Sequence, residues 1–320
     1  MQVKPNFFVV GTAKAGTTSL YYYLKQHPEI YLSPIKETNF FAKDIDISKF
    51  TDDYKRTMLI DLENYFSKEK LEEIPIAIVN KYSYYEKLFQ NVTNEKVIGE
   101  ISNSYLYSKV AAKEIYKFNP HAKIIMILRN PVDRAYSHYI MNVREGYEVK
   151  QNFIEEIYED FNKKEKGWGV SHLYIELGLY YEQVKRYLET FPEENIKIIY
   201  YEDYSNDVAN TVKNIFEFLN VNKEVDINFN IKANQGLKPK NQFVNKVLFS
   251  IARKMKPLIP KDKREKLREY YFRIFFEKKK NISELDKEKL IHFFYEDVAK
   301  LSDMLNIDLL KKWNFKNELS

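Results

Sequence analysis

The sequence predicts an α/β fold in three layers, in which a central parallel sheet is flanked by helices and followed by a helical C-terminal extension. Short apolar runs rich in β-branched residues alternate with segments of helical periodicity over residues 1–241. Strands that are buried on both faces and alternate with helices form a parallel sheet with right-handed crossovers. Beyond residue 241 the strand-like runs stop, and charged, helix-forming sequence follows. We therefore expect a single domain over 1–320, with an α/β core in 1–241 and a helical part, 242–320, packed on it.

Four strands and four helices are predicted from these patterns. The sequence KIIMIL over 123–128 is the clearest strand, because five apolar residues follow one another. The expected strands are 6–10, 96–99, 123–128 and 196–201, and the expected helices are 18–26, 109–118, 132–144 and 208–219. Ligands of parallel sheets bind beyond the carboxyl ends of the strands. The residues that follow each strand are therefore candidates for a binding site.

The composition describes a folded chain and excludes several classes of function. The 320 residues are 44% hydrophobic and 30% charged, which argues against disorder. The absence of cysteine excludes disulfides, iron–sulfur clusters and a cysteine nucleophile. A net charge of +5 is too small to indicate a nucleic-acid partner. The N-terminus does not resemble a signal peptide, and the apolar runs are too short to span a bilayer, so we expect a cytoplasmic protein.

One segment of the chain is strongly basic. Residues Lys246–Lys280 contain thirteen Lys and Arg against four Asp and Glu, a local net charge of +9 that leaves −4 for the rest. Apolar residues recur at helical spacing among them, from Val244 to Met255. Basic amphipathic helices bind anionic membrane surfaces, but helices packed against the sheet with a solvated basic face give the same pattern. A basic surface that binds the donor is a further alternative. For 244–280, peripheral contact with the inner face of a membrane is therefore one of three interpretations. No pattern indicates an oligomeric state.

A glycine-bounded loop follows the first expected strand. Gly11–Thr18 (GTAKAGTT) lies between a strand and a helix, where backbone N–H groups and the helix dipole converge on an anion. The glycine spacing is that of a P-loop, but Thr17 stands where a P-loop has lysine, and Lys14 lies inside the loop instead. The alternative is a plain strand–helix turn in which Thr17 and Thr18 cap the helix.

An arginine follows the strand at 123–128. Nucleotide kinases need an acidic residue after such a strand to hold magnesium, whereas Arg129 would bind a phosphate directly and without a metal. Ser137, eight residues later on the expected helix, can hold the same phosphate. The alternative for Arg129 is a structural ion pair with Asp133 or Glu100.

A carboxylate stands beside a lysine at Lys36-Glu37, ahead of two phenylalanines. Such a carboxylate at the mouth of a site can take a proton from a hydroxyl group. A charged surface turn followed by phenylalanines of the core would look the same.

Together these motifs resemble the sulfotransferases that use 3′-phosphoadenosine 5′-phosphosulfate, most closely their bacterial and Golgi carbohydrate-type branch. The loop 11–18, the pair Lys36-Glu37 and the sequence LRNPVDRAYSHY over 128–139 occur in the order and at the separation typical of that family. Residues 178–192, Tyr201-Glu202-Asp203 and Trp313 agree with it. The resemblance covers nearly the whole chain.

The resemblance implies a P-loop-like fold and a metal-free, in-line transfer of a sulfuryl group from 3′-phosphoadenosine 5′-phosphosulfate to a hydroxyl of a carbohydrate or glycolipid. It implies that Lys14 neutralises the leaving phosphate and that Glu37 is the general base. Arg129 and Ser137 would bind the 3′-phosphate, and Lys240 in the late loop 234–240 would add a contact to it. The residues that complete the 5′-phosphosulfate loop would be Ala15, Gly16, Thr17 and Thr18. A sulfuryl group carries less charge than a phosphoryl group, so cationic side chains can suffice.

Two positions depart from the family's pattern. Ile101 stands where many Golgi members have a lysine, so a second catalytic cation from that place is missing. Lys240 stands where the family has an arginine after proline, and lysine keeps the charge but loses the bidentate geometry. Compensation for the missing cation by Lys238 or Lys240 is a conjecture.

Other residues and other functions stay open at this point. His138, beside Ser137, either lines the donor site or packs its helix, and packing is favoured. Tyr105 and Tyr107 either face an acceptor sugar or are half-buried side chains of the fold. The acceptor pocket is expected from the variable loops 44–85 and 146–172. The alternative functions are a P-loop nucleotide kinase and a non-catalytic peripheral membrane protein.

Overall fold

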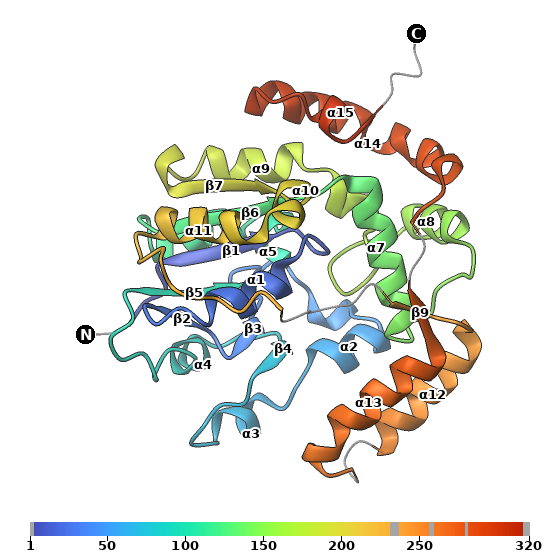
Figure 1. The fold of residues 1–320 in the computed structure, drawn as a ribbon, viewed down its shortest axis with the longest axis horizontal. Helices are drawn as coiled ribbons and strands as arrows, with labels where there is room; N and C mark the ends of the chain where they lie inside the picture. Colours follow the sequence, from blue (N-terminus) through green and yellow to red (C-terminus); the bar gives the residue numbers. More distant parts are fainter. Residues whose placement is uncertain (1–2, 231–236, 256–258, 279–280, 316–320) are drawn as a thin grey trace.

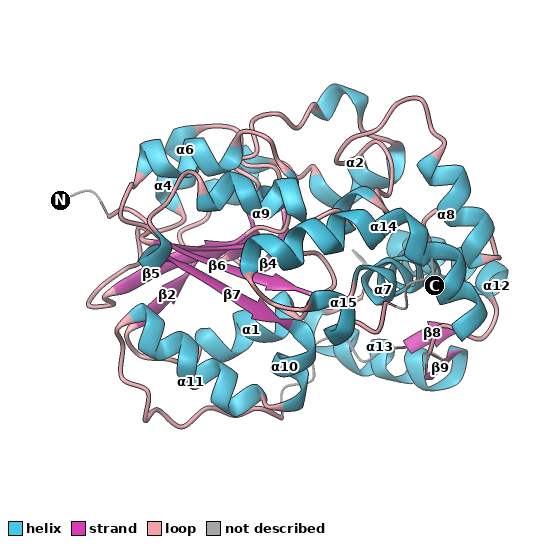
Figure 2. Cartoon of the chain, turned by 90° about the horizontal axis from the view of Figure 1, so that it is seen from above, coloured by secondary structure: helices cyan, strands magenta, loops and turns pink. Residues whose placement is uncertain are grey.

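In the computed structural model, five parallel strands form a sheet between two layers of helices (Figures 1 and 2). The structure describes residues 3–230, 237–255, 259–278 and 281–315. The strand order is β2-β5-β1-β6-β7, so that β1 lies at the centre. The bounds are β1 Phe7–Gly11, β2 Ile30–Leu32, β5 Val97–Ile101, β6 Lys123–Leu128 and β7 Ile196–Tyr200.

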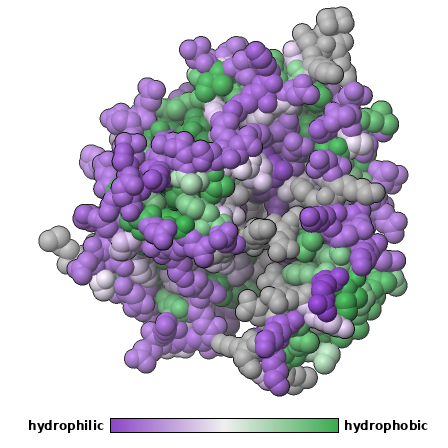
Figure 3. Space-filling model, viewed as in Figure 1, coloured by the Kyte–Doolittle hydropathy of each residue, from purple (hydrophilic) through white to green (hydrophobic). Residues whose placement is uncertain are grey.

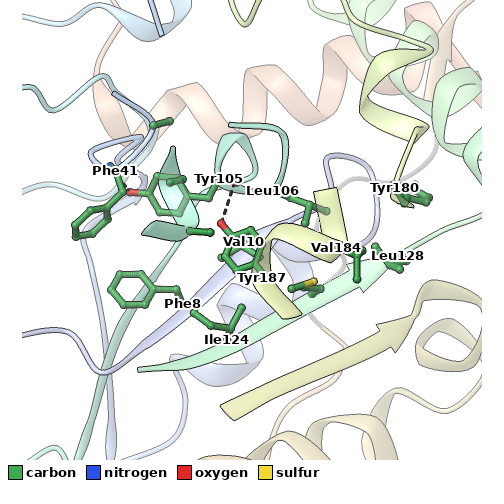
Figure 4. Packing of buried hydrophobic residues seen from close by; sticks show 14 of the residues in the cluster. Phe8, Val10, Phe41, Tyr105, Leu106, Ile124, Leu128, Tyr180, Val184 and Tyr187 are labelled. Atoms are coloured by element: carbon green, nitrogen blue, oxygen red, sulfur yellow. Dashed lines mark hydrogen bonds between the residues drawn. The ribbon is translucent and has the colours of Figure 1, made fainter. Parts of the chain in front are cut away.

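The central strand is buried on both faces because its side chains alternate between two parts of the core. Phe7 and Val9 pack with the helices α1 (Thr17–Leu24) and α11 (Val208–Leu219). Phe8 and Val10 point the other way, toward α5, α6 and α9 (Figure 4). This is the alternation that a pleated strand imposes. The helices on this second side are α5 (Ser104–Tyr107), α6 (Ala111–Phe118) and α9 (Tyr181–Leu188), and α4 (Tyr82–Lys87) lies beside them.

Every strand and helix predicted from the sequence is present. The strand over 123–128 and the helix over 208–219 have the expected bounds, and the others agree within about two residues. The helix predicted at 132–144 is α7, Pro131–Arg144. The short pairs β3–β4 and β8–β9 were not predicted, and β9 contradicts the expectation that strands stop at residue 241. Three residues are too few for a periodic pattern, and the pairing partner stabilises such strands. Their bounds are β3 Ile35–Glu37, β4 Ile74–Ile76, β8 Leu237–Pro239 and β9 Phe276–Lys278.

The helices of the C-terminal part lie in two different places. The long helix α14 (Glu284–Leu305) buries Leu290, Phe294 and Val298 in the core. In contrast, α12 (Gln242–Met255) and α13 (Lys261–Phe275) lie side by side at the edge of the molecule, away from the sheet (Figure 1). The remaining helices are α2 (Asp52–Met58), α3 (Leu62–Phe66), α8 (Phe153–Phe161), α10 (Tyr201–Asn206) and α15 (Leu309–Lys312). Within the described part of the chain, no helix has both the length and the apolar sequence that crossing a membrane requires.

Candidate active site

A cavity of about 1700 Å³ opens beyond the carboxyl ends of the central strands. The sequence predicted a ligand site at this edge of the sheet. Side chains from segments far apart in the chain line the cavity. Ala15, in the loop that follows β1, is fully buried and is not among the residues that line the cavity. The predicted site residues that line the cavity are Lys14, Gly16, Thr17, Thr18, Glu37, Arg129 and Ser137.

The loop after β1 has the backbone geometry of an anion site. Lys14 and Gly16 have positive φ values of 72° and 85°. At Gly16 a Cβ would lie 2.7 Å from Cε1 of Tyr204, so only glycine fits there. Gly16 is also the N-cap of α1, and Thr17 is the first helical residue. The interpretation of Thr17 as a mere cap is therefore wrong, and the first backbone N–H groups of α1 remain available to a ligand.

Arg129 joins the two predicted phosphate motifs. Its Nη1 donates a hydrogen bond to the backbone oxygen of Lys14 over 2.7 Å. Its guanidinium lies 4.3 Å from the centre of the Tyr201 ring, in a cation–π contact. These partners differ from the ion pairs with Asp133 or Glu100 that were the alternative. Arg129 therefore lies at the cavity wall next to the phosphate loop.

The turn that carries Arg129 is fixed by the C-terminal end of the described chain. The backbone N–H of Asn130 donates to Oε1 of Glu202 over 3.0 Å, and the indole Nε1 of Trp313 donates to Oε2 of the same carboxylate over 3.1 Å. The side-chain amide of Asn130 donates to the backbone oxygen of Trp313 over 2.9 Å. Tyr180 donates its hydroxyl to the backbone oxygen of Arg129. Trp313 was noted in the sequence, but its contact with this turn was not predicted.

Ser137 and His138 lie on α7, two turns beyond the Arg129 turn, and both line the cavity. His138 is buried, and its Nδ1 has no hydrogen-bond partner among the described residues. Burial and the neighbouring Arg134 guanidinium hold the pKa of His138 well below its usual range, so the imidazole is neutral. The ring packs against Tyr174 at 5.1 Å, in agreement with the predicted packing role.

Glu37 ends β3 at the cavity wall, and only 14% of its side chain is exposed. Its Oε1 accepts hydrogen bonds from Nζ of Lys36 and from Nδ2 of Asn103, each over 2.7 Å. Asn103 follows β5 and was not predicted as a site residue. A carboxylate has about four acceptor positions, so these two bonds orient Glu37 and leave room for a substrate hydroxyl.

Glu100 lies beneath this wall and not at the surface of the site. It is 1% exposed, and its carboxylate accepts hydrogen bonds from the hydroxyls of Thr38 and Tyr105. Burial raises the pKa of Glu100 to about 7. Tyr105 is itself fully buried, so the interpretation in which it faces an acceptor is wrong. The cluster fixes Thr38, the neighbour of Glu37.

Another group of residues at the cavity wall is aromatic. Tyr54 and Tyr147 stack with ring centres 5.3 Å apart, and the Tyr54 hydroxyl lies 3.0 Å from Nδ1 of His172. Trp168 lines the same cavity. These residues come from the loops 44–85 and 146–172, the two segments expected to build an acceptor pocket.

The sequence model of the sulfotransferase domain family matches residues 4–290 of this chain. The chain belongs to this family.

The chain is similar in sequence or structure to several known sulfotransferases. The sulfotransferase crystal structure from Alicyclobacillus acidocaldarius is 29% identical, covers 98% of this chain and 99% of its own, and superposes with a TM-score of 0.68. Carbohydrate sulfotransferase 15 of Mus musculus is 26% identical over 254 residues, which are 68% of this chain and 44% of the relative. The membrane-associated sulfotransferase kil1 of Dictyostelium discoideum is 30% identical over 143 residues, 44% of this chain and 23% of the relative. The chain thus spans less than half the length of these two curated relatives.

The two departures of this sulfotransferase-domain sequence lie away from the cavity. Ile101 is fully buried and packs in the core beside α1. Lys240 is not among the lining residues, and its Nζ donates to the backbone oxygen of Ile274 over 2.7 Å. Residues 234–236 of the late loop lie outside the described residues, and Leu237 at its end does line the cavity. Lys36 lines the cavity beside Glu37. The sequence had indicated Lys36 only as the neighbour of Glu37 and not as a cation of the site.

Proposed function

We propose that this sulfotransferase-domain protein transfers a sulfuryl group from 3′-phosphoadenosine 5′-phosphosulfate to a hydroxyl group of a carbohydrate. The observation that carries the proposal is the convergence of Lys14, Glu37 and Arg129 on one cavity. Each of these residues has the chemistry that one part of the reaction needs. The 29% identical sulfotransferase that matches the chain along its whole length supports the same reaction class.

The donor site combines a helix N-terminus with two cations. The 5′-phosphosulfate would lie on the loop 14–18, where the backbone N–H groups of α1 and the side chain of Lys14 meet an anion. The 3′-phosphate would lie between Arg129 and Ser137. The guanidinium offers paired N–H donors to a phosphate. This second phosphate is what distinguishes the donor from ATP. In this proposal the cationic side chains supply the neutralisation that magnesium supplies in a kinase.

The reaction itself is a single displacement at sulfur. The acceptor oxygen forms a bond to sulfur while the bond between sulfur and the 5′-phosphate oxygen breaks. Glu37 takes the proton of the acceptor hydroxyl, and Lys14 stabilises the charge on the leaving phosphate. The products are a sulfate monoester and 3′,5′-bisphosphoadenosine. Asn103 and Lys36 hold the Glu37 carboxylate for this role.

A carbohydrate acceptor is supported by the aromatic wall and by one relative. Trp168 is half-buried at the cavity wall, beside the stacked and buried Tyr54 and Tyr147 and the polar ring of His172, and an aromatic ring next to polar groups suits the apolar and hydroxylated sides of a sugar. One relative is named carbohydrate sulfotransferase 15, and its name states the same class of acceptor. The sugar and the position that is sulfated are left to experiment.

A comparison of nucleotides tests the donor. Thermal unfolding is measured with 3′,5′-bisphosphoadenosine, with ADP, and with ATP and magnesium, each at the same concentration. The proposal expects the largest rise in Tm with 3′,5′-bisphosphoadenosine and no need for magnesium, since ligand binding to the folded state raises Tm. A larger, magnesium-dependent rise with ATP would overturn it in favour of a P-loop nucleotide kinase.

A further inference from the structure

The helix α12 carries a row of apolar side chains that face solvent. Phe243, Val247, Ile251 and Met255 follow one another at four-residue intervals and are 71%, 43%, 49% and 48% exposed. Residues four apart lie on one face of a helix. In a helix of a globular protein such a row normally faces the core. Figure 3 shows hydrophobic side chains at the surface of this corner of the molecule.

The neighbouring helix α13 continues the apolar surface and adds cations. Leu267, Tyr270 and Ile274 are spaced at helical intervals and are 50%, 57% and 36% exposed. Lys263 and Lys266, both exposed, each lie one turn before an apolar residue of that row, Leu267 and Tyr270 respectively. Lysine and apolar residues therefore share one side of the helix.

The exposed rows are not needed to hold the two helices in place. Asn245, which is 1% exposed, donates from its side-chain amide to the backbone oxygens of Val143 and Arg144 at the end of α7. Tyr271 donates its hydroxyl to Oδ1 of Asn245 over 2.7 Å and ties α13 to α12. The attachment is thus made by Asn245 and Tyr271. Phe243, Val247 and Ile274 of the exposed rows belong to none of the hydrophobic clusters of the described chain.

The charge of the segment selects the kind of partner. Between Lys246 and Lys280 the net charge is +9, so two copies of this surface would repel each other if their outer faces met. An anionic lipid bilayer accepts both features at once, because apolar side chains enter the headgroup boundary while lysines meet the lipid phosphates. Each Lys or Arg near such a surface contributes about fivefold to partitioning.

We propose that the outer face of α12 and α13 is a docking surface for an anionic lipid bilayer. This inference does not rest on the proposed function. Packing of the basic segment against the sheet is not what the structure shows, because the two helices lie beside the sheet layers and expose their apolar rows. The alternative of a donor-binding surface stays a prediction for those residues of the two helices that line the cavity. Ile251, Met255 and Leu267 belong both to the exposed rows and to the lining of the cavity. The cavity would therefore open at the bilayer, within reach of an acceptor carried on a lipid.

Vesicle flotation tests the docking surface. The full chain is mixed with vesicles of phosphatidylcholine alone and with vesicles that contain equal amounts of phosphatidylcholine and phosphatidylglycerol. We expect flotation with the anionic vesicles, weakened at least tenfold by high salt and negligible without phosphatidylglycerol. The paired substitutions Phe243→Asp with Val247→Asp, and Lys263→Glu with Lys266→Glu, should each lower the bound fraction at least tenfold. None of these four residues lines the cavity.

The flotation test needs a control substitution outside the surface and two measurements that show each variant is folded. Leu285 on α14 is 63% exposed, so Leu285→Asp changes an equally exposed apolar residue outside the surface and should leave flotation unchanged. Circular dichroism and thermal unfolding with 3′,5′-bisphosphoadenosine confirm that each variant is folded, whatever its membrane binding. Equal binding to neutral vesicles, binding that survives both paired substitutions, or no binding by the native chain would overturn the proposal. A concentration-dependent dimer that Phe243→Asp with Val247→Asp abolishes would assign the surface to a second copy instead.

Discussion

The indole nitrogen of Trp313 donates a hydrogen bond to the carboxylate of Glu202 over 3.1 Å, across 111 positions of sequence. The other oxygen of the same carboxylate accepts from the backbone N–H of Asn130, directly after Arg129. Trp313 is 3% exposed and packs in the main core. The C-terminal tryptophan therefore holds the turn that presents Arg129 to the cavity.

Replacement of Trp313 by phenylalanine should weaken both the fold and the donor site. The variant keeps an aromatic ring but leaves one oxygen of Glu202 without its donor, which costs about 1–3 kcal/mol in the free energy of unfolding. The Arg129 turn loses one of its anchors, so the dissociation constant of 3′,5′-bisphosphoadenosine should rise several-fold. Urea unfolding and calorimetric titration measure the two effects. An unchanged dissociation constant in a destabilised variant would show that Trp313 serves the core alone.

Replacement of Glu37 by glutamine should abolish turnover and spare the donor. Glutamine keeps the size of the side chain but cannot take a proton, and a general base contributes about 10²–10⁴-fold in rate. The dissociation constant of 3′,5′-bisphosphoadenosine should stay within about twofold. Sulfuryl transfer to a panel of saccharides and calorimetric titration measure the two quantities. Glu217→Gln, at an exposed carboxylate on α11, is the matched control. Turnover that survives, or donor binding that collapses, would contradict the role as base.

Replacement of Arg129 by alanine should remove the preference for a nucleotide with a 3′-phosphate. Hydrogen bonds to a charged group contribute about 1.5–3 kcal/mol, so affinity for 3′,5′-bisphosphoadenosine should fall about tenfold to a hundredfold while that for ADP changes little. Arg129→Lys should lie between the two, since lysine keeps the charge without the paired donors. Lys117→Ala removes an exposed surface cation as a control. Equal losses for both nucleotides would place Arg129 at the other phosphate.

The buried carboxyl of Glu100 should make stability depend on pH. Burial raises its pKa to about 7, whereas an unfolded glutamate has a pKa of about 4.3. Between these values the folded state retains a proton that the unfolded state has lost, so stability falls as the pH rises through this window and levels off above it. The full change is about 4 kcal/mol. Urea unfolding of the native chain and of Glu100→Gln across pH 4.5 to 8 measures the difference. A difference between the two proteins that does not vary with pH would refute this assignment.

Local sequence patterns determined the framework and half of the site. The runs at 123–128 and 208–219 have apolar spacing long enough to define a strand and a helix, and both were found with the predicted bounds. Lys14, Glu37 and Arg129 could be selected because each directly follows, or closely precedes, a recognisable element. The carboxyl-edge rule for parallel sheets then predicted that Lys14 and Arg129 would meet, and the family resemblance added Glu37 to them.

Only the tertiary structure decided how these residues are held and what faces solvent. Asn103 reaches Glu37 across 66 positions and Trp313 reaches Glu202 across 111, and no local period records such contacts. Glu100 and Arg129 looked like partners in sequence, yet Glu100 is buried with Thr38 and Arg129 contacts the Lys14 backbone. The spacing of α12 was evident from its residues, but whether its apolar row faces the sheet or solvent depends on where α7 anchors it. Periodicity reports which residues share a face, and only packing between distant segments determines what that face meets.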